Sequence, residues 1–120
     1  MQLYIGNKNY SSWSLRPWLL MTQTGIDFEE VRLHLSWDAN SEFKQTLLRL
    51  APTGRVPLLV DDGFAVWDTL AIAEYLAEKY PAKALWPAST RARARARSLC
   101  AEMHSGFGAL RESFPMNIEA

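Results

Sequence analysis

The sequence predicts an α/β fold in which helices cover both faces of a mixed sheet. Three observations predict it: two strand-like segments that are each followed by a helical segment, a β-hairpin signal after them, and an amphipathic helix after the hairpin. Strand–helix units favour parallel pairing, whereas a hairpin adds an antiparallel part. With 120 residues, the chain is long enough for one compact domain with its own core.

The first strand–helix unit stands at the N-terminus. Residues 3–5 form a short apolar strand. Helical spacing of apolar side chains follows Ser11 and Ser12, and Gly25 stands where a helix C-cap belongs. Pro17 is assigned to the first turn of this helix, where a missing N–H group costs nothing.

The remaining elements complete the predicted sheet and its cover. Residues 29–35 alternate apolar and polar side chains, which predicts a half-buried strand. Residues 41–50 form a short helix. Asp62-Gly63 lies between two apolar runs and is a strong hairpin signal. Residues 69–80 then form an amphipathic helix that packs against the sheet.

A second and incomplete domain follows the first. We assign residues 1–81 to one domain, and residues 82–120 to a linker and one long helix from about Thr90 to near Ser113. The apolar stripe of this helix would face water, and an exposed face of that size usually finds a partner. We therefore expect a chain that is truncated after the first helix of a larger helical domain, and that forms a homodimer.

The composition excludes several classes of partner. The chain carries 13 Lys and Arg residues against 13 Asp and Glu residues, so its formal net charge is zero. Nucleic acids and anionic membrane surfaces both favour a basic excess, so we expect neither. No apolar run approaches the ~20 residues that span a bilayer.

Cysteine and histidine usage bounds the location and the metal chemistry. The lone Cys100 excludes an internal disulfide and fits a reducing compartment, so we expect a cytoplasmic protein. His34 and His104 stand apart from any group of Cys, Asp or Glu at metal-binding spacing, so we expect no metal.

Two segments carry residues that suit either a structural role or a ligand. Ser11 and Ser12 precede the first helix, where serine usually caps, but a hydroxyl at a helix N-terminus also stabilises a thiolate. Pro57 opens a strand. With a trans bond it is an ordinary edge residue, whereas a cis Val56–Pro57 bond would free the Val56 backbone to pair with an extended peptide ligand.

A third segment stands where the hairpin meets the amphipathic helix. Asp68 or Thr69 is the expected N-cap of that helix. The same residues also suit an anion site, because exposed N–H groups and the Thr69 hydroxyl would hold a carboxylate there. Asp68 would meanwhile pair with an ammonium group. Such a site fits the head group of an α-amino acid.

In their order and spacing, these segments resemble the N-terminal domain of the cytosolic glutathione transferases along the whole chain. The matching features are the serines before the first helix, the Val56-Pro57 step, and Asp68-Thr69-Leu70-Ala71-Ile72. The last is similar to the family's acidic-Ser-x-Ala-Ile motif, with Thr in place of Ser. The resemblance implies a thioredoxin-like fold, with a four-stranded sheet in the order βαβαββα and a cis Pro57.

The resemblance also implies a function and its residues. A glutathione S-transferase binds glutathione as its co-substrate and activates the thiol as a thiolate, which attacks a small electrophile. Ser11 and Ser12 both fit the position that contacts the thiol, and Ser11 is slightly preferred. The resemblance implies that glutathione is bound by Trp13, Val56, Pro57, Asp68 and Thr69, and that Met103, His104 and Phe107 border the second-substrate pocket.

Within that family, the pattern Ser11-Ser12-x-Ser14-x-Arg16 is most similar to the zeta class, which includes maleylacetoacetate isomerases. That class carries Cys where this chain has Trp13, so the resemblance does not extend to isomerase activity. The alternative function is a non-catalytic module that binds glutathione or a protein but lacks a complete electrophile site. A glutaredoxin-like oxidoreductase is disfavoured, because no Cys stands at the start of the first helix.

Overall fold

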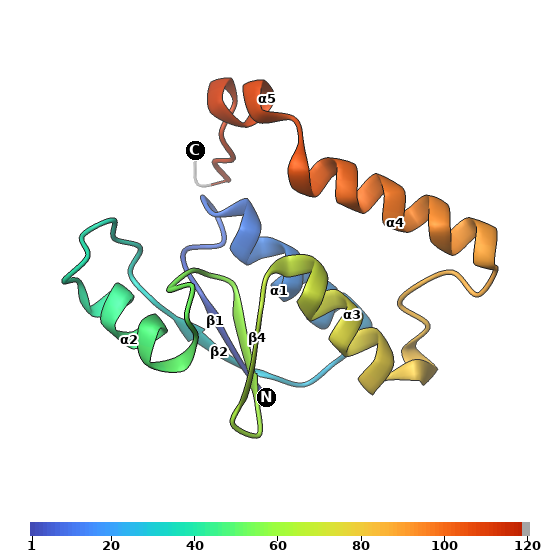
Figure 1. Ribbon diagram of the computed structural model, residues 1–120, viewed down its shortest axis with the longest axis horizontal. Helices are drawn as coiled ribbons and strands as arrows, with labels where there is room; N and C mark the ends of the chain where they lie inside the picture. The colour runs from blue at the N-terminus through green and yellow to red at the C-terminus, as the bar shows by residue number, and fades with distance from the viewer. Residues whose placement is uncertain (119–120) are drawn as a thin grey trace.

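The computed structural model describes residues 1–118. They fold around a four-stranded sheet (Figure 1). Helices α1 and α3 lie side by side, and α2 packs separately from them. The predicted α/β fold is confirmed. The elements in chain order are β1 (Gln2–Ile5), α1 (Ser12–Thr24), β2 (Glu29–Arg32), α2 (Glu42–Leu50), β3 (Leu58–Asp61), β4 (Phe64–Trp67), α3 (Thr69–Lys79), the 3-10 helix η1 (Pro81–Lys83), α4 (Thr90–Ser105) and α5 (Gly108–Ser113).

The sheet has the strand order β2-β1-β3-β4. Strand β1 runs parallel to β2 and antiparallel to β3, and β3 and β4 form an antiparallel hairpin. Leu3 lies opposite Leu59, and Tyr4 lies opposite Leu58. Because side chains alternate along a strand, these two pairs point to opposite faces of the sheet.

Each face of the sheet is covered by its own apolar core. On one face, α1 and α3 bury Leu3 and Ile5 completely, whereas α2 packs on the other face through Phe43 and Leu47. Full burial of such a side chain stabilises the fold by about 1.5–3 kcal/mol. The buried members are Leu3, Ile5, Met21, Ile26, Leu59, Ile72 and Leu76 in the first core, and Phe43, Leu47, Ala51 and Leu58 in the second.

Strand β2 is shorter than the alternating pattern predicts. The pattern continues to residue 35, but the strand ends at Arg32, and one further bond runs from the Leu33 N–H to the Ile5 carbonyl. The reason is that β1 itself ends at Ile5, so the following residues have no partner strand. Leu35 instead packs over Gly6, where an added Cβ would clash with the Leu35 side chain.

The start and end of α1 follow from local sequence. Buried Ser14 accepts a hydrogen bond from the Gly6 N–H at 3.0 Å, which fixes the helix against the end of β1. Gly25 adopts the left-handed conformation with φ of 66° and caps the C-terminus, as predicted. The position assigned to Pro17 was wrong. It lies inside the helix, beyond the first turn, so its missing N–H leaves the Trp13 carbonyl without its usual helical partner.

The predicted hairpin is confirmed, and an ionic network joins it to α3. Asp62 and Gly63 both have positive φ, which suits a two-residue turn between β3 and β4. Just before the turn, buried Asp61 accepts a hydrogen bond from the Tyr75 hydroxyl at 2.6 Å and forms an ion pair with Lys79. The hydrogen bonds from Lys79 and from Tyr75 lower the pKa of the Asp61 carboxyl below its usual value.

The C-terminal segment packs more loosely than the sheet region. The single helix expected from Thr90 to Ser113 is divided at Gly106 and Phe107, and Phe107 adopts the left-handed conformation. Neither α4 nor α5 contains a buried residue. Arg97 on α4 binds both carboxylate oxygens of Glu74 on α3, at 2.9 and 3.0 Å.

Among residues 1–118, no helix combines the length and apolar character needed to cross a membrane.

Candidate functional site

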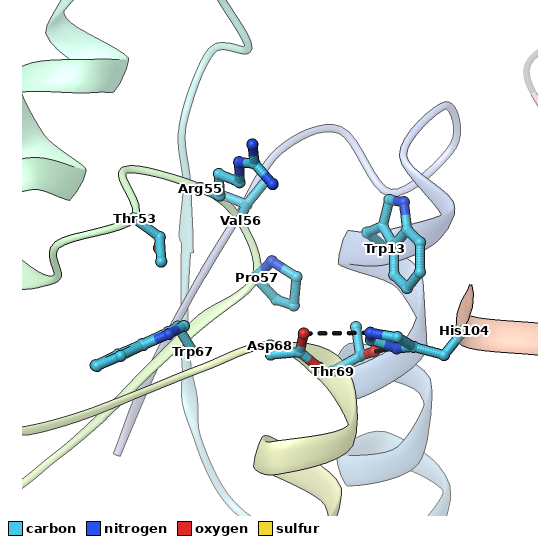
Figure 2. Close-up of a pocket in the computed structure, with 9 residues that line it drawn as sticks. All are labelled: Trp13, Thr53, Arg55, Val56, Pro57, Trp67, Asp68, Thr69 and His104. Atoms are coloured by element: carbon cyan, nitrogen blue, oxygen red, sulfur yellow. Dashed lines mark hydrogen bonds and ion pairs between the residues drawn. The ribbon is translucent and has the colours of Figure 1, made fainter. Parts of the chain in front are cut away.

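A small cleft opens between the start of β3, the junction of β4 and α3, the start of α1 and the end of α4 (Figure 2). Its volume is about 310 Å³. Figure 2 shows Trp13 and His104 on one side, Thr53 and Trp67 on the other, and Pro57 between them. We call this site the smaller cleft; it is lined by Trp13, Thr53, Arg55, Val56, Pro57, Trp67, Asp68, Thr69 and His104.

The step from Val56 to Pro57 forms the floor of the smaller cleft. The peptide bond between them is cis, as the sequence resemblance implies. Pro57 is buried and Val56 is half-buried. Within residues 1–118, neither the N–H nor the C=O group of Val56 makes a backbone hydrogen bond. Both groups are therefore available to an extended ligand.

The N-terminus of α3 opens onto the same cleft. Asp68 caps the helix, because its Oδ1 accepts a hydrogen bond from the Leu70 N–H at 3.0 Å. The Asp68 backbone has φ of 82°, a conformation that costs about 1–3 kcal/mol for a residue with a side chain. Thr69 is the first residue of the helix and is buried. The N–H groups of a first helical turn have no partner inside the helix, and here only that of Leu70 is bound by the cap.

His104 reaches this site from the far end of α4. Its Nδ1 lies 3.2 Å from the Thr69 hydroxyl oxygen, and its Nε2 lies 3.2 Å from Asp68 Oδ2 (Figure 2). Its ring also contacts Trp13 edge-on, with the ring centroids 5.0 Å apart. The sequence assigned His104 to the second-substrate pocket. In the structure it lies against the start of α3, where it contacts two residues of the smaller cleft.

The serines at the start of α1 line a second and larger cavity, next to the smaller cleft. Ser11 is the N-cap of α1, and its Oγ accepts a hydrogen bond from the Ser14 N–H at 3.2 Å. A capping hydroxyl that accepts in this way still has its own hydrogen to donate. Ser12 is the first residue of the helix. The capping role expected by default is therefore present, and it leaves the Ser11 O–H free for a ligand.

The larger cavity has a volume of about 890 Å³ and a mostly apolar wall. It shares Trp13, Arg55 and Val56 with the smaller cleft, so the two sites adjoin. Met103 and Phe107 line it, and these are two of the residues that the resemblance assigned to the second-substrate pocket. The full lining is Tyr10, Ser11, Ser12, Trp13, Arg16, Leu35, Ser36, Trp37, Phe43, Lys44, Gly54, Arg55, Val56, Met103, Phe107, Leu110, Arg111, Phe114, Pro115 and Met116.

Four cations lie around the two sites, and the sequence analysis assigned none of them to a ligand site. Arg55 directly precedes Val56, and Lys44 donates to the Gly54 carbonyl at 2.8 Å. Only Arg55 stands next to the Val56-Pro57 step in the sequence, and this position was its available signal. Arg16 and Arg111 line the larger cavity. Burial and the nearby Arg111 charge lower the pKa of the Arg16 guanidinium.

Among residues 1–118, no group of three or more His, Cys, Asp or Glu side chains is arranged to hold a metal.

The fold and the cleft define the class of this protein. It is a thioredoxin-like domain whose smaller cleft is built from a cis-proline step and from two helix N-termini. The model of the glutathione S-transferase N-terminal domain matches residues 10–79. The chain therefore belongs to the glutathione S-transferase family.

Individual relatives agree with this assignment. The chain is 35% identical over 102 residues to a maleylacetoacetate isomerase of Pseudomonas aeruginosa, a match to 84% of this chain and 47% of the relative. It is 40% identical over 72 residues to a dichloromethane dehalogenase of Methylophilus leisingeri, a match to 58% of this chain and 26% of the relative. The chain thus spans less than half the length of both relatives.

A solved structure has the same architecture. A glutathione transferase homologue from Burkholderia, with bound glutathione, is 35% identical to this chain and superposes with a TM-score of 0.74. The match covers 92% of this chain and 56% of that one.

Proposed function

We propose that this chain is the glutathione-binding part of a glutathione S-transferase. The observation that carries the proposal is the smaller cleft, where the unpaired Val56 backbone, the N-terminus of α3 and the Trp13 side chain meet. A family relative with bound glutathione supports it. In this proposal residues 1–81 form the glutathione-binding domain. Residues 82–120 form a linker and the start of a helical domain, and residues 119–120 lie outside the described part of the chain.

The start of α3 suits the γ-glutamyl end of glutathione, which is a zwitterion. Its carboxylate would accept hydrogen bonds from N–H groups of the first helical turn and from the Thr69 hydroxyl, where the helix dipole favours negative charge. Its ammonium would pair with the Asp68 carboxylate, whose other oxygen caps the helix. The N–H and C=O groups of Val56 would pair with the cysteinyl part. Arg55 and Lys44 offer positive charge for the glycyl carboxylate.

The start of α1 suits the thiol. A free thiol has a pKa near ~8.5, so little thiolate is present at neutral pH. A hydrogen bond to a charged acceptor contributes about 1.5–3 kcal/mol, and one pKa unit corresponds to ~1.4 kcal/mol. One O–H donated by Ser11, together with the dipole of α1, therefore brings the thiol pKa close to neutrality. We favour Ser11 over Ser12 because its cap bond fixes its orientation.

The larger cavity would hold the electrophile beside the sulfur. The thiolate sulfur forms a bond to the electrophilic carbon, the bond from that carbon to its leaving group breaks, and the leaving group departs with the electron pair. The thiol proton passes to water.

Further parts of this proposal are a cytoplasmic location and a homodimer. The exposed apolar side chains of α4 and α5, such as Leu99, support the dimer, and sedimentation velocity over a range of concentrations tests it.

Titration calorimetry with glutathione tests the proposal directly. We expect saturable binding to one site per chain, and weaker binding of glutaryl-cysteinylglycine, which differs from glutathione by the missing ammonium. A conjugation assay with chlorodinitrobenzene then measures turnover. Absence of glutathione binding at millimolar concentration would overturn the assignment.

One observation favours a second candidate, a module that binds glutathione without turnover. Phe107, Leu110 and Phe114 form part of the wall of the larger cavity, yet these side chains are 47%, 52% and 76% exposed. The electrophile site is therefore open on that side. Glutathione binding without conjugation of chlorodinitrobenzene would select this module over the enzyme.

A further inference from the structure

One carboxylate joins three elements around the start of α1. Glu30 on β2 accepts hydrogen bonds from Lys8 Nζ at both of its carboxylate oxygens, at 2.8 and 3.0 Å. Its Oε2 also accepts a hydrogen bond from Trp18 Nε1 at 2.8 Å. Lys8 Nζ lies 4.6 Å from the centroid of the Trp18 ring, so the cation also contacts the aromatic face. We call these three side chains the Glu30 cluster.

The Glu30 cluster is partly buried and is attached to the first core. The side chains of Lys8 and Glu30 are each only 30% exposed. Glu30 lies opposite Leu3 in the parallel pairing of β2 with β1, and Leu3 is a fully buried core residue. Trp18 packs against the same core. Salt screens a partly buried ion pair less than one at the surface, so this cluster can hold a loop in place.

The loop that carries Ser11 is attached to this cluster. Lys8 belongs to residues 6–11, which connect β1 to α1. Within this loop, the Asn7 carbonyl accepts a hydrogen bond from the Ser11 N–H at 2.8 Å. The turn from Asn7 to Ser11 is thus closed by a hydrogen bond between its ends, and Lys8 lies inside it. A displacement of Lys8 is therefore transmitted to Ser11.

Ser11 lies between two residues that bind the same carboxylate. Lys8 comes three residues before it, and Trp18 comes seven residues after it, about two turns into α1. The cap bond from the Ser14 N–H orients the Ser11 hydroxyl relative to the helix. The Glu30 cluster adds a second constraint, because it ties the loop and the helix to β2.

We propose that Glu30 is a positioning residue for the Ser11 hydroxyl, and that it acts through Lys8 and Trp18. This inference rests on the proposed function, since it concerns the group that donates to the glutathione thiolate. Glu30 lines neither the smaller cleft nor the larger cavity, so its effect on the thiol is indirect. A hydrogen bond weakens steeply when its donor is misaligned, so a looser loop leaves the thiol less ionised.

The pKa of the bound thiol separates positioning from a simple effect of charge. The ultraviolet absorbance of the thiolate reports this pKa in the complex with glutathione and requires no turnover. Glu30→Gln removes a negative charge, which by itself would favour the thiolate and lower the pKa of the thiol. Loss of positioning has the opposite sign. We expect the pKa to rise by about half a unit to one unit, which lowers the thiolate fraction about 3- to 10-fold at a pH below the pKa.

The other charges near the thiol do not differ between these chains. The cations that line the larger cavity are the same in every variant, so a difference in thiol pKa reports the substitution alone; they are Arg16, Lys44, Arg55 and Arg111.

Three further substitutions assign the effect to residues. Glu29→Gln is the matched control, because Glu29 is also on β2 but accepts its hydrogen bond from Gln2 on β1, at 3.1 Å. It should leave the thiol pKa unchanged or slightly lower. Trp18→Phe removes a hydrogen bond to Glu30 without a change of charge, so it should raise the thiol pKa. In a Ser11→Ala background, Glu30→Gln should have almost no further effect.

The outcomes separate this inference from the proposed function. An unchanged or lowered thiol pKa in Glu30→Gln and Trp18→Phe, with glutathione bound normally, overturns the positioning role alone. A merely structural role gives this result together with a lower midpoint of thermal unfolding. A rise that persists in the Ser11→Ala background also overturns it, because Glu30 then acts through another group. Failure of the unmodified chain to bind glutathione overturns the proposed function and this inference together. If Glu30→Gln does not fold, Trp18→Phe decides.

Discussion

The two helices that open onto the ligand sites begin differently. Helix α1 starts with neutral hydroxyls, and Arg16 lies one turn further on. Helix α3 is capped by Asp68, which has a carboxylate side chain and a positive φ, and Thr69 follows as its first residue. Both N-termini carry the same partial positive charge from the helix dipole. Side chains, not the backbone, therefore decide which ligand group each end suits.

The two helix starts are also held by different interactions. At α1, the neutral bond from the Gly6 N–H to Ser14 fixes the helix to β1, and the charged Glu30 cluster holds the loop before it. At α3, charged groups hold the hairpin and the helix together through Asp61 and Lys79, and His104 contacts the first turn from α4. This difference predicts that acid and loss of charge affect the attachment of α3, whereas loss of a hydroxyl affects the start of α1.

The largest expected effect belongs to the α1 side. In Ser11→Ala, the conjugation rate at neutral pH should fall about 10- to 100-fold, because one hydrogen bond to the thiolate is lost. The rate should recover as the pH rises past the pKa of a free thiol at ~8.5. The pH profile of kcat/KM with chlorodinitrobenzene measures this.

Ser12→Ala is the matched control for that experiment, and it should change the rate only slightly. If Ser12→Ala loses the rate and Ser11→Ala keeps it, the two serines exchange roles. Ser11→Ala also removes the N-cap, so the free energy of unfolding should fall by about 1 kcal/mol, which thermal unfolding reports separately.

The next effect concerns the ionic network that holds α3. In Asp61→Asn, the free energy of unfolding at neutral pH should fall by about 2 kcal/mol, because a buried carboxylate that accepts two hydrogen bonds loses its charge. The pKa of Asp61 is lowered in the folded state, so its contribution is present above the unfolded value of ~3.9 and is lost as the pH falls below it. Denaturant unfolding between neutral pH and pH ~3 measures both.

The variant itself provides the control for the pH dependence. Asp61→Asn should lose less stability than the unmodified chain as the pH falls through this window. Equal acid sensitivity of the two chains would mean that other carboxylates hold the α3 side.

Asp68 gives a third effect, on affinity. Asn tolerates positive φ and still accepts the cap bond from Leu70, so Asp68→Asn keeps the cap and removes the charge together with the contact between Oδ2 and His104. We expect the dissociation constant of glutathione to rise about tenfold, since one charged hydrogen bond is lost. For glutaryl-cysteinylglycine, which lacks the ammonium, the same substitution should have almost no effect. An equal loss for both ligands would place the ammonium elsewhere.

What the sequence predicts well is what short segments decide. Gly25 as a C-cap and Asp62 and Gly63 as a turn depend on residues a few positions apart, and both are found in the structure. Of the two expected N-caps, Asp68 and Thr69, the structure has Asp68. The two-sided core follows from the same local alternation. Gly106 and Gly108 weaken a helix, so the sequence gives a sign of a break in this region. Nothing in the sequence indicates that Phe107 adopts the left-handed conformation there.

What the sequence predicts poorly depends on packing between distant elements. The alternating pattern of β2 gives no sign that its partner β1 ends first. His104 meets Asp68 and Thr69 because α4 lies against α3, where Arg97 also pairs with Glu74. The larger cavity likewise needs residues of α5. Long-range contacts of this kind leave no periodic trace in one sequence.

The smallest expected effect tests whether His104 is a positioning residue on the α3 side. It contacts Thr69 and Asp68 without being needed for the cap bond, so His104→Gln should weaken glutathione binding only about threefold. A structural role alone would lower stability and leave the ligand preference unchanged. A positioning role should also shrink the difference in affinity between glutathione and glutaryl-cysteinylglycine, because Asp68 is then held less firmly against the ammonium. Calorimetry with both ligands, alongside thermal unfolding, decides between the two roles. An unchanged difference between the ligands would confine His104 to joining α4 to α3.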